Sequence, residues 1–376
     1  MMRSMGLWRS ALGLFLVGVI YACGGFAARG QEVPQAPGGE HRARPQEPKP
    51  PFPYLEEEVT YRNPNASGVE LAGAFTAPRK ETASPAVLLI TGAGPQDRDD
   101  TIAGHKFFLV LADYLTRHDI AVLRVDRRGV GQSTGDFKYA TTKDFASDAE
   151  AGVRYLMKRK EVDQRHIGLI GHGEGAIIAA MVASRMTQQI AFAVLLNGTA
   201  VSGDKVLLAQ TARAEAAAGV PDEQIDADLR IGSGIYRLVE QGRSVAEIDQ
   251  ALSNVPENYK PFVEPWKRQV PKLDSPWLHY FLLYNPTSAL EEVKCPVLAL
   301  FGEKDMTIDP EQNASAMKTA FSHARNREAK VKILPELNYL FQKANTGLGR
   351  EYESIPETIS PVALETIQAW IAKQVQ

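Results

Sequence analysis

The chain has 376 residues, of which 44% are hydrophobic, and a formal net charge of −3. This composition supplies enough apolar side chains for one large or two modest globular domains. The small negative charge excludes the strongly basic surface on which nucleic-acid binding depends, so we predict no nucleic-acid partner.

The N-terminal segment has the pattern of a secretory signal. Arg3 and Arg9 precede the apolar run at residues 11–22, and small residues follow it. The run is too short to span a bilayer comfortably. We therefore predict a signal peptide at residues 1–30, and an exported protein that is periplasmic or extracellular.

Two further features bear on the N-terminal region. Cys23 would permit a lipid anchor instead, but Tyr21 stands where a lipoprotein signal needs a small residue. We therefore expect membrane contact only through the signal segment, with an anchor at Cys23 as the alternative. Residues 31–53 are rich in proline and charge, which predicts a disordered linker. The pattern does not indicate an oligomeric state.

From residue 54 to 376 short apolar runs alternate with helical patterns. Two period-two segments near the start favour antiparallel strands, and the later runs are typical of parallel strands buried on both faces. We predict an α/β domain at 54–376 with a doubly wound, mostly parallel sheet. The expected strands include 86–91, 120–125, 166–170, 192–196, 297–302 and 330–335.

One interval breaks this alternation. Residues 203–290 contain helical patterns and an aromatic segment, SPWLHYFLLYNP, but no strand pattern. An insertion between two sheet strands at their carboxyl edge would lie over the site expected there. We therefore predict a helical cap at about 203–290 whose aromatic side chains line a ligand pocket.

The strand-turn-helix stretch HIGLIGHGEGAIIA has the frame of a nucleophile elbow, G-x-S-x-G. Its central residue, however, is Gly173. The acid of a hydrolase triad belongs just past a later strand, where Asp305 follows VLALFG, with Asp309 as the alternative. None of the seven histidines follows the strand at 330–335, and Tyr339 stands in the loop where the base would lie. A phenol is a poor base near neutral pH.

Other residues offer weaker substitutes for the missing groups. Ser133 lies in a literal G-x-S-x-G, but in a broad loop that lacks the strand and helix of an elbow, and Ser233 lies inside the predicted cap. His172 and Glu174 flank Gly173 and form a conceivable acid–base pair. No H-x-x-x-H or Cys/His cluster occurs, so we predict neither a metal nor another cofactor.

The oxyanion hole, in contrast, is expected to be complete. A glycine-rich loop at 92–100 follows the strand at 86–91, which is where one oxyanion donor originates. We predict the backbone N–H groups of Ala93 and Glu174 as the two donors. Asp97, Arg98 and Asp99 should form a salt-bridged scaffold beneath the loop.

These strings together resemble the exported bacterial α/β-hydrolases of the serine-aminopeptidase-like carboxylesterase group. The resemblance runs from about residue 54 to the C-terminus and rests on VLLITGAGPQDRDDTIAGHK, VLRVDRRGVGQSTGDF, IGLIGHGEGAIIA, SPW, CPVLALFGEKD, LNYLFQKANTGL and ETISP. It implies an α/β-hydrolase fold with a serine in G-H-S-E-G, an aspartate in GExD and a histidine in an LNHLFQ-like segment. These positions fall on Gly173, Asp305 and Tyr339.

The residues and the resemblance thus agree that the serine and the histidine are missing, at Gly173 and Tyr339. Without a serine no acyl-enzyme forms, so we predict a non-catalytic or impaired hydrolase whose capped pocket binds an ester-, amide- or acyl-like small molecule. A working ester hydrolase with a rearranged nucleophile, and a protein-interaction module, are the alternatives.

Overall fold

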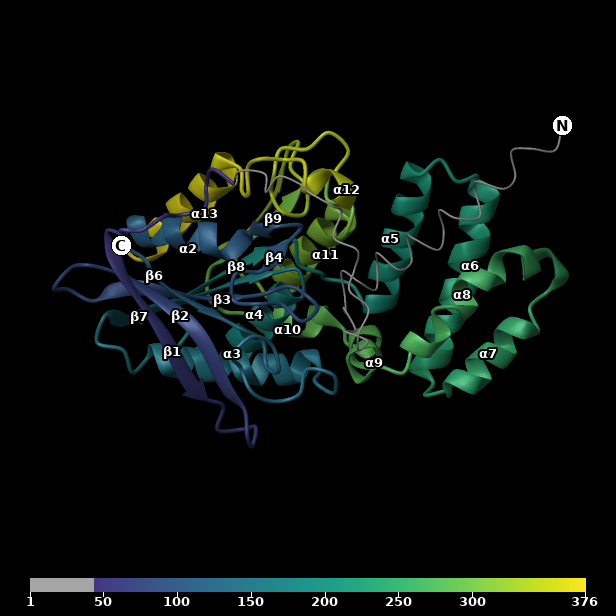
Figure 1. Ribbon diagram of the computed structural model, residues 1–376, viewed down its shortest axis with the longest axis horizontal. Coiled ribbons are helices and arrows are strands. Elements are labelled where there is room, and N and C mark those ends of the chain that lie inside the picture. Colours follow the sequence, from purple (N-terminus) through teal and green to yellow (C-terminus); the bar gives the residue numbers. More distant parts are fainter. Residues whose placement is uncertain (1–43) are drawn as a thin grey trace.

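The computed structural model describes residues 44–376, which fold around one eight-stranded sheet (Figure 1). In spatial order the strands are β1 (Tyr54–Arg62), β2 (Glu70–Pro78), β6 (Ala121–Val125), β3 (Ser84–Ile90), β7 (Val162–His172), β8 (Phe192–Leu196), β9 (Val297–Gly302) and β10 (Ala329–Leu334). A separate ribbon pairs β4 (Thr101–Ile102) with β5 (His105–Lys106).

The strand directions confirm the predicted mostly parallel sheet with antiparallel N-terminal strands. β1 runs antiparallel to β2, and β2 antiparallel to β6. Every later pairing, from β6 through β3, β7, β8 and β9 to β10, is parallel. All residues of β8 and β9 are buried, as expected for strands covered on both faces.

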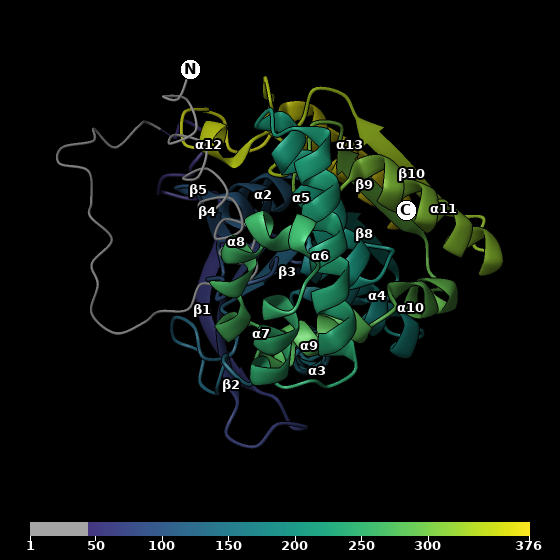
Figure 2. The same cartoon turned by 90° about the vertical axis from the view of Figure 1, so that its right-hand side faces the viewer.

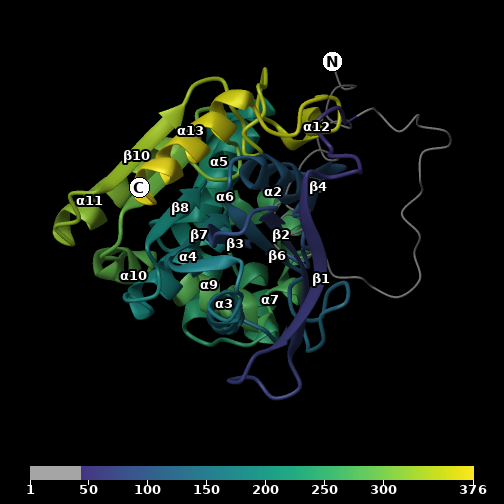
Figure 3. The same ribbon diagram turned by 90° about the vertical axis from the view of Figure 1, so that its left-hand side faces the viewer.

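Helices cover the two faces of the sheet (Figure 3). On one face α2 (Phe107–Arg117) and α13 (Pro361–Gln374) pack in one apolar core, and the short α12 (Gly349–Tyr352) adds Tyr352 to it. On the other face α3 (Thr142–Leu156), α4 (Glu174–Arg185) and α11 (Pro310–His323) pack in a second core. The chain therefore forms the three layers that a doubly wound sheet requires.

Between β8 and β9 a group of helices stands away from the sheet (Figures 1 and 2). We call this group the cap; it comprises α5 (Gly203–Ala217), α6 (Asp222–Glu240), α7 (Val245–Ser253), η1 (Glu257–Phe262), α8 (Val263–Lys267), η2 (Val270–Lys272) and α9 (Pro276–Leu283). The next helix, α10 (Pro286–Glu292), lies within the predicted cap range but packs on α4 and α11 instead. The helical insertion thus returns to the body of the domain a few residues earlier than predicted.

A pair of carboxyl groups lies inside the cap. Glu215 on α5 and Asp228 on α6 are buried, and the Trp266 indole Nε1 donates to Asp228 Oδ1 at 2.8 Å. Burial, together with the neighbouring Asp228, raises the pKa of Glu215 to about 8. Burial also raises the pKa of Asp228, so both carboxyl groups of this pair resist ionisation inside the cap.

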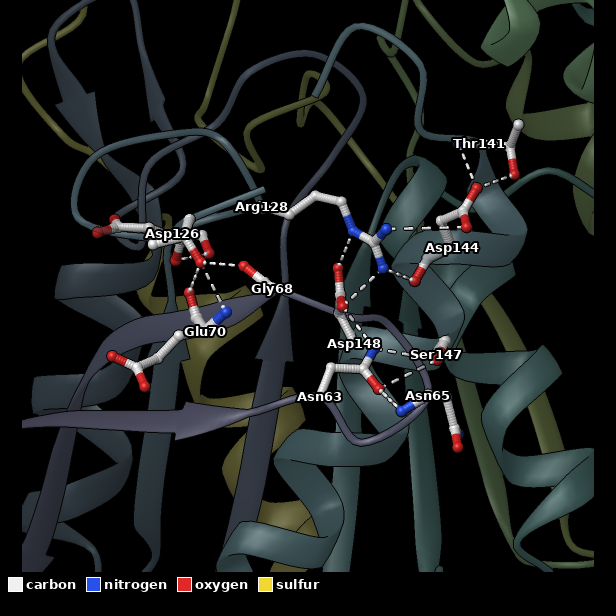
Figure 4. Close-up of polar contacts among 12 residues, drawn as sticks. Asn63, Asn65, Gly68, Glu70, Asp126, Arg128, Thr141, Asp144, Ser147 and Asp148 are labelled. Carbon is white, nitrogen blue, oxygen red and sulfur yellow. Dashed lines mark hydrogen bonds and ion pairs between the residues drawn. The ribbon is translucent and has the colours of Figure 1, made fainter. Parts of the chain in front are cut away.

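The loop after β6 is joined to the β1–β2 hairpin and to α3 by buried polar contacts (Figure 4). Arg128 Nε lies 2.6 Å from Asp148 Oδ2, and Arg128 Nη2 lies 2.8 Å from Asp148 Oδ1. Asn63 Nδ2, at the end of the hairpin strand, donates to Asp148 Oδ1 at 2.8 Å. Both members of this ion pair are buried, and Asp144 Oδ1, 3.8 Å from Arg128 Nη1, is a second and more distant partner of the guanidinium.

The described part of the predicted linker is bound to the domain. Arg44 Nη1 donates to the Ile355 carbonyl at 2.6 Å, and Gln46 Nε2 donates to the Ile359 carbonyl at 2.7 Å. The start of residues 44–53 therefore lies against the C-terminal loop. Composition alone does not predict these contacts, because they depend on backbone carbonyls far away in the sequence. The predicted signal peptide, Cys23 and residues 31–43 lie outside the described residues. Within 44–376, no helix is long and apolar enough to cross a bilayer.

Candidate active site

The turn between β7 and α4 keeps the geometry of a nucleophile elbow. Gly173 has φ 54° and ψ −116°, a conformation that residues with a side chain rarely adopt. Two neighbours must also be glycine, because a Cβ on Gly171 would overlap the Gly175 carbonyl and one on Gly175 would overlap the Ile90 carbonyl. The backbone frame of the predicted elbow is therefore present.

The Tyr339 hydroxyl fills the space in front of this turn. A Cβ built on Gly173 would overlap that hydroxyl oxygen and lie 3.4 Å from Tyr339 Cζ. A Cβ on Gly92, in the oxyanion loop, would lie 3.2 Å from the same oxygen. The phenol thus occupies the volume that a serine side chain at 173 would need. Sequence reasoning had identified both substitutions but not that the two residues are in contact.

His172 holds Tyr339 in place and does not face the cavity. The His172 ring is fully buried between the rings of Phe107 and Tyr339, with centroids 4.7 and 4.3 Å away. Its Nδ1 lies 2.7 Å from Asp100 Oδ2, and its Nε2 lies 3.1 Å from the Tyr339 carbonyl oxygen. Because both nitrogens have partners inside the protein, the arrangement gives no support to an acid–base role.

Glu174 is likewise engaged inside the protein. Arg127 Nη1 lies 2.9 Å from Glu174 Oε2, while Thr142 Oγ1 and Trp277 Nε1 donate to Oε1 at 2.6 and 2.7 Å. Since Trp277 belongs to α9, this carboxylate ties the cap to the elbow. Trp277 belongs to the SPW string that supports the family resemblance, but only the structure shows that its indole N–H donates to Glu174.

Asp305 lies where the orienting acid was predicted, directly after β9. It is fully buried, and its Oδ1 accepts from the backbone N–H groups of Thr307 and Ile308 at 2.7 and 2.9 Å. Its Oδ2 has no hydrogen-bond partner among the described residues. Burial raises the pKa of Asp305 to about 7. A buried carboxyl group therefore lies at the position predicted for the acid, with one oxygen that bonds to no described residue.

Asp309, the alternative acid, has a structural role. Its Oδ1 accepts from Gln312 N at 2.9 Å at the start of α11, and its Oδ2 lies 3.0 Å from Arg213 Nη1. Arg213, on cap helix α5, also donates to the Asp305 carbonyl oxygen at 2.7 Å. This arginine therefore fastens a second point of the cap to the acid loop, a contact that no local pattern signals.

Two of the three residues predicted to form a salt-bridged scaffold, Arg98 and Asp99, make ion pairs, whereas Asp97 accepts hydrogen bonds instead. Arg98 lies 2.8 Å from Asp126 Oδ2, Asp99 pairs with Arg124, and Asp97 accepts from the Asp99 and Thr101 backbone N–H groups at 3.1 Å each. The backbone of Ala93 borders the same cavity as Glu174. The N–H of Glu174, at the first position of α4, has no intrahelical carbonyl to bond. Ala93 and Glu174, the two predicted donor residues, therefore line one cavity.

Ser133, in contrast, is a turn residue. Its hydroxyl donates to the Asp126 carbonyl at 2.8 Å and accepts from Ala72 N at 2.9 Å, and the side chain is buried. Ser233 lies on α6 in the cap, away from the elbow. The two serines considered as substitutes therefore have no elbow around them.

A cavity of about 820 Å³ separates the elbow from the cap. Its closed end is formed by the elbow and oxyanion loop, and its walls by side chains of α4, α5, α9, the acid loop and α12. The lining residues include Ile177, Val206, Leu207, Ala214, Trp277, Phe281, Met306, Ile308, Leu348 and Tyr352. Its size and apolar walls are those of a small-molecule site.

Comparisons with known proteins agree with this architecture. Residues 87–338 match the alpha/beta hydrolase family. The chain is 24% identical over 296 residues to the Esterase EstD of Thermotoga maritima, a match covering 77% of this chain; the chain thus spans 61% of the length of that esterase. An uncharacterized 31.7 kDa protein in the traX-finO intergenic region of Escherichia coli is 25% identical over 211 residues, covering 54% of this chain and 68% of that protein.

Two solved structures share the fold at low sequence identity. The Pyrococcus furiosus esterase Pf2001 superposes with a TM-score of 0.51 at 16% identity, covering 90% of this chain and 100% of that one. The alpha/beta hydrolase GrgF from Penicillium sp. sh18 superposes with a TM-score of 0.53 at 16% identity, covering 85% and 99%. At these identities the likeness is one of fold.

Proposed function

Because this chain belongs to the alpha/beta hydrolase family, we propose that it has given up ester hydrolysis through a serine and uses its capped cavity to bind an ester-, amide- or acyl-like ligand. The observation that carries this proposal is the contact between Gly173 and Tyr339: the phenol hydroxyl lies where the nucleophile would be. That relatives are named as esterases supports a ligand with an acyl group.

The chemistry of the remaining groups supports a loss of turnover. A phenol is protonated near neutral pH, and to act as a nucleophile it would need a base to accept its proton. The His172 ring packs at a tilt against Tyr339, and its nitrogens lie against Asp100 and the Tyr339 carbonyl. Loss of triad members lowers turnover on the order of a million-fold and leaves roughly 10³–10⁴-fold over water.

The test is a restoration series. We expect the wild-type protein to hydrolyse a small activated aryl ester no faster than this residual level. Gly173→Ser alone should stay inactive and lose stability, because its side chain overlaps the phenol. Tyr339→His alone should be inactive because it lacks a nucleophile. The double variant should gain burst kinetics and react with a fluorophosphonate, if Asp305 and the N–H groups of Ala93 and Glu174 act as proposed.

The same assays test the alternative of a rearranged nucleophile. Rapid wild-type turnover that Ser133→Ala abolishes, in a variant shown to be folded by circular dichroism, would contradict the proposal. Stoichiometric labelling of the wild-type protein by the fluorophosphonate would contradict it as well. The fold check is required because the Ser133 hydroxyl makes two buried hydrogen bonds.

We also propose that the protein is exported, on the basis of the N-terminal charge and apolar pattern. Expression of the full chain followed by N-terminal sequencing of the mature protein should give Gln31 as the first residue. A mature protein that retains Met1, or one that carries a lipid on Cys23, would contradict this route.

A further inference from the structure

One polar side chain interrupts the apolar face that the cap presents to the cavity. Along α5 the residues that line the cavity are Val206, Leu207, Gln210 and Ala214. Because residues four apart lie on the same face of a helix, Val206, Gln210 and Ala214 form one row along α5. Gln210 is the polar member of this row, so its side chain lies among apolar neighbours on the wall of the cavity.

The amide of Gln210 is buried but has no partner in the described part of the chain. The residue is 8% exposed, and its side chain makes no hydrogen bond with a described residue. Its amide atoms are not among the unpartnered side-chain atoms that are sealed from solvent, so a molecule in the cavity can reach them. A glutamine side chain carries two N–H donors and an acceptor oxygen. These groups are therefore available to a ligand.

Other polar side chains on the cavity wall are already engaged. Gln96 Nε2 donates to a backbone carbonyl of its own loop at 3.2 Å, and Thr101 Oγ1 donates to Asp97 Oδ2 at 2.8 Å. The Glu174 carboxylate accepts from three side chains. Gln210 differs from these residues because the fold does not use its hydrogen-bonding groups.

Gln210 lies where the cap meets the acid loop. Arg213, three residues further along α5, donates to the Asp305 carbonyl at 2.7 Å and lies 3.7 Å from Met306 Sδ. Met306 also lines the cavity. Figure 1 shows α5 as the cap helix that lies nearer the sheet than α6 and α7. The Gln210 amide therefore belongs to the cap wall, and is separate from the elbow and the oxyanion loop.

The chemistry of this amide defines the ligand group that pairs with it. A ligand that fills the cavity excludes water from the amide, and it loses affinity unless its own groups replace those hydrogen bonds. The Gln210 side chain presents its oxygen and one N–H on the same edge, so the complementary group carries one donor and one acceptor side by side. We call this arrangement an amide edge. Primary carboxamides and lactams have an amide edge, whereas esters and tertiary amides offer acceptors only.

The rest of the cavity wall favours an apolar ligand body. Trp277 and Phe281 of α9 stack with ring centroids 5.1 Å apart, and both line the cavity with Ile177 and Ile308. Burial of hydrocarbon against such side chains is favourable in proportion to the apolar area removed from water. The cavity therefore combines apolar walls with one unused amide on the cap side.

From these contacts we infer that the ligand is an apolar compound with an amide edge, a primary carboxamide or a lactam, and that Gln210 binds this edge on the cap wall. Gln210 Nε2 donates to the ligand carbonyl, and Gln210 Oε1 accepts from the ligand N–H. The hydrocarbon part lies against Trp277 and Phe281. The inference rests on the proposed function for one premise, that the cavity binds a ligand.

The experiment compares ligands that differ mainly in this edge. Octanamide has the donor and the acceptor, whereas N,N-dimethyloctanamide and methyl octanoate have acceptors only. Caprolactam and N-methylcaprolactam form the matching pair of lactams. Binding to the purified protein is measured by titration calorimetry. We expect octanamide to bind about tenfold more tightly than its dimethyl derivative, because that derivative leaves the Gln210 oxygen buried without a donor.

Gln210→Met tests the assigned contact, since it keeps the length of the side chain and removes both polar groups. In this variant the preference for octanamide over N,N-dimethyloctanamide should disappear, while methyl octanoate should bind at least as tightly as before. The urea midpoint should not fall, because no described residue loses a hydrogen bond. Gln250→Met, at an exposed glutamine of α7 outside the cavity lining, is the matched control and should change neither property.

The outcomes separate this inference from the proposed function. Equal affinity of the wild type for the two members of both pairs would overturn the amide edge and leave an acyl-binding cavity. A preference that survives in Gln210→Met, or a urea midpoint that falls in that variant, would overturn the role of Gln210. A preference confined to octanamide or to caprolactam supports the inference and identifies which amide is bound.

Binding of none of these compounds would overturn both the amide edge and the proposed ligand cavity. Rapid hydrolysis of the activated aryl ester by the wild type would contradict the proposed loss of catalysis alone, because the preference for an amide edge does not depend on turnover.

Discussion

The buried pair Glu215–Asp228 predicts how the stability of the protein depends on pH. In the unfolded chain a glutamate has a pKa of 4.5, whereas burial and the adjacent Asp228 raise the pKa of Glu215 to about 8 in the folded cap. Below pH 4.5 both states hold the proton. As the pH rises toward 8 the unfolded chain releases it first, so the free energy of unfolding falls across this window and levels off above it.

The size of the effect follows from the two pKa values. Each pKa unit corresponds to 1.36 kcal/mol, so the interval from 4.5 to about 8 corresponds to about 5 kcal/mol for this group. A loss of this size is a large part of the stability of an ordinary domain. Glu215→Gln keeps the shape and a donor toward Asp228 but cannot ionise, so its stability should lack this component.

The assay is urea unfolding of the wild type and Glu215→Gln at pH 5, 6, 7, 8 and 9. The difference between the two free energies of unfolding isolates Glu215 from the other titrating groups. We expect Glu215→Gln to gain on the wild type steadily between pH 5 and 8, while exposed Glu328→Gln follows the wild type throughout. Parallel curves for the wild type and Glu215→Gln would refute the reasoning.

Two further predictions concern contacts that join the parts of the domain. Asp148→Asn leaves the buried Arg128 guanidinium with only the more distant Asp144 carboxylate, so urea unfolding should show a loss of up to about 3–5 kcal/mol. Glu70→Gln, in an exposed pair, should lose less than about 1 kcal/mol, and equal losses would contradict this. Trp277→Phe removes a hydrogen-bond donor to Glu174, so the free energy of unfolding should fall by about 1.5–3 kcal/mol. Limited proteolysis should also cleave the cap sooner. An unchanged cleavage rate would contradict the role of Trp277 in holding the cap to the elbow.

The layers of the fold could be predicted because their signals are local. Short apolar runs such as 192–196 and 297–302 are fully buried strands. Asp305 follows the second of these strands, at the edge of the sheet where it was expected. The structure ends the cap a few residues before the predicted boundary of about 290, because a helical pattern does not say which neighbour a helix such as α10 packs on. The composition of residues 44–53 likewise does not predict their hydrogen bonds to the C-terminal loop.

The contacts that decide the site could not be predicted in this way. Glu336 and Phe341 adopt positive φ angles of 62° and 54°, so the loop after β10 turns sharply and directs the Tyr339 phenol toward the elbow. Such a turn is set by tertiary packing, since neither residue type favours that conformation.

The overlap between residue 173 and Tyr339 couples any change made at these two positions. A side chain at 173 requires the phenol to move, because a Cβ there overlaps the Tyr339 hydroxyl oxygen. Glycine is also at ease at φ 54°, where a serine would store about 1–3 kcal/mol of strain. A serine at 173 therefore fits without displacement only after Tyr339 has been replaced, which gives the two substitutions an order.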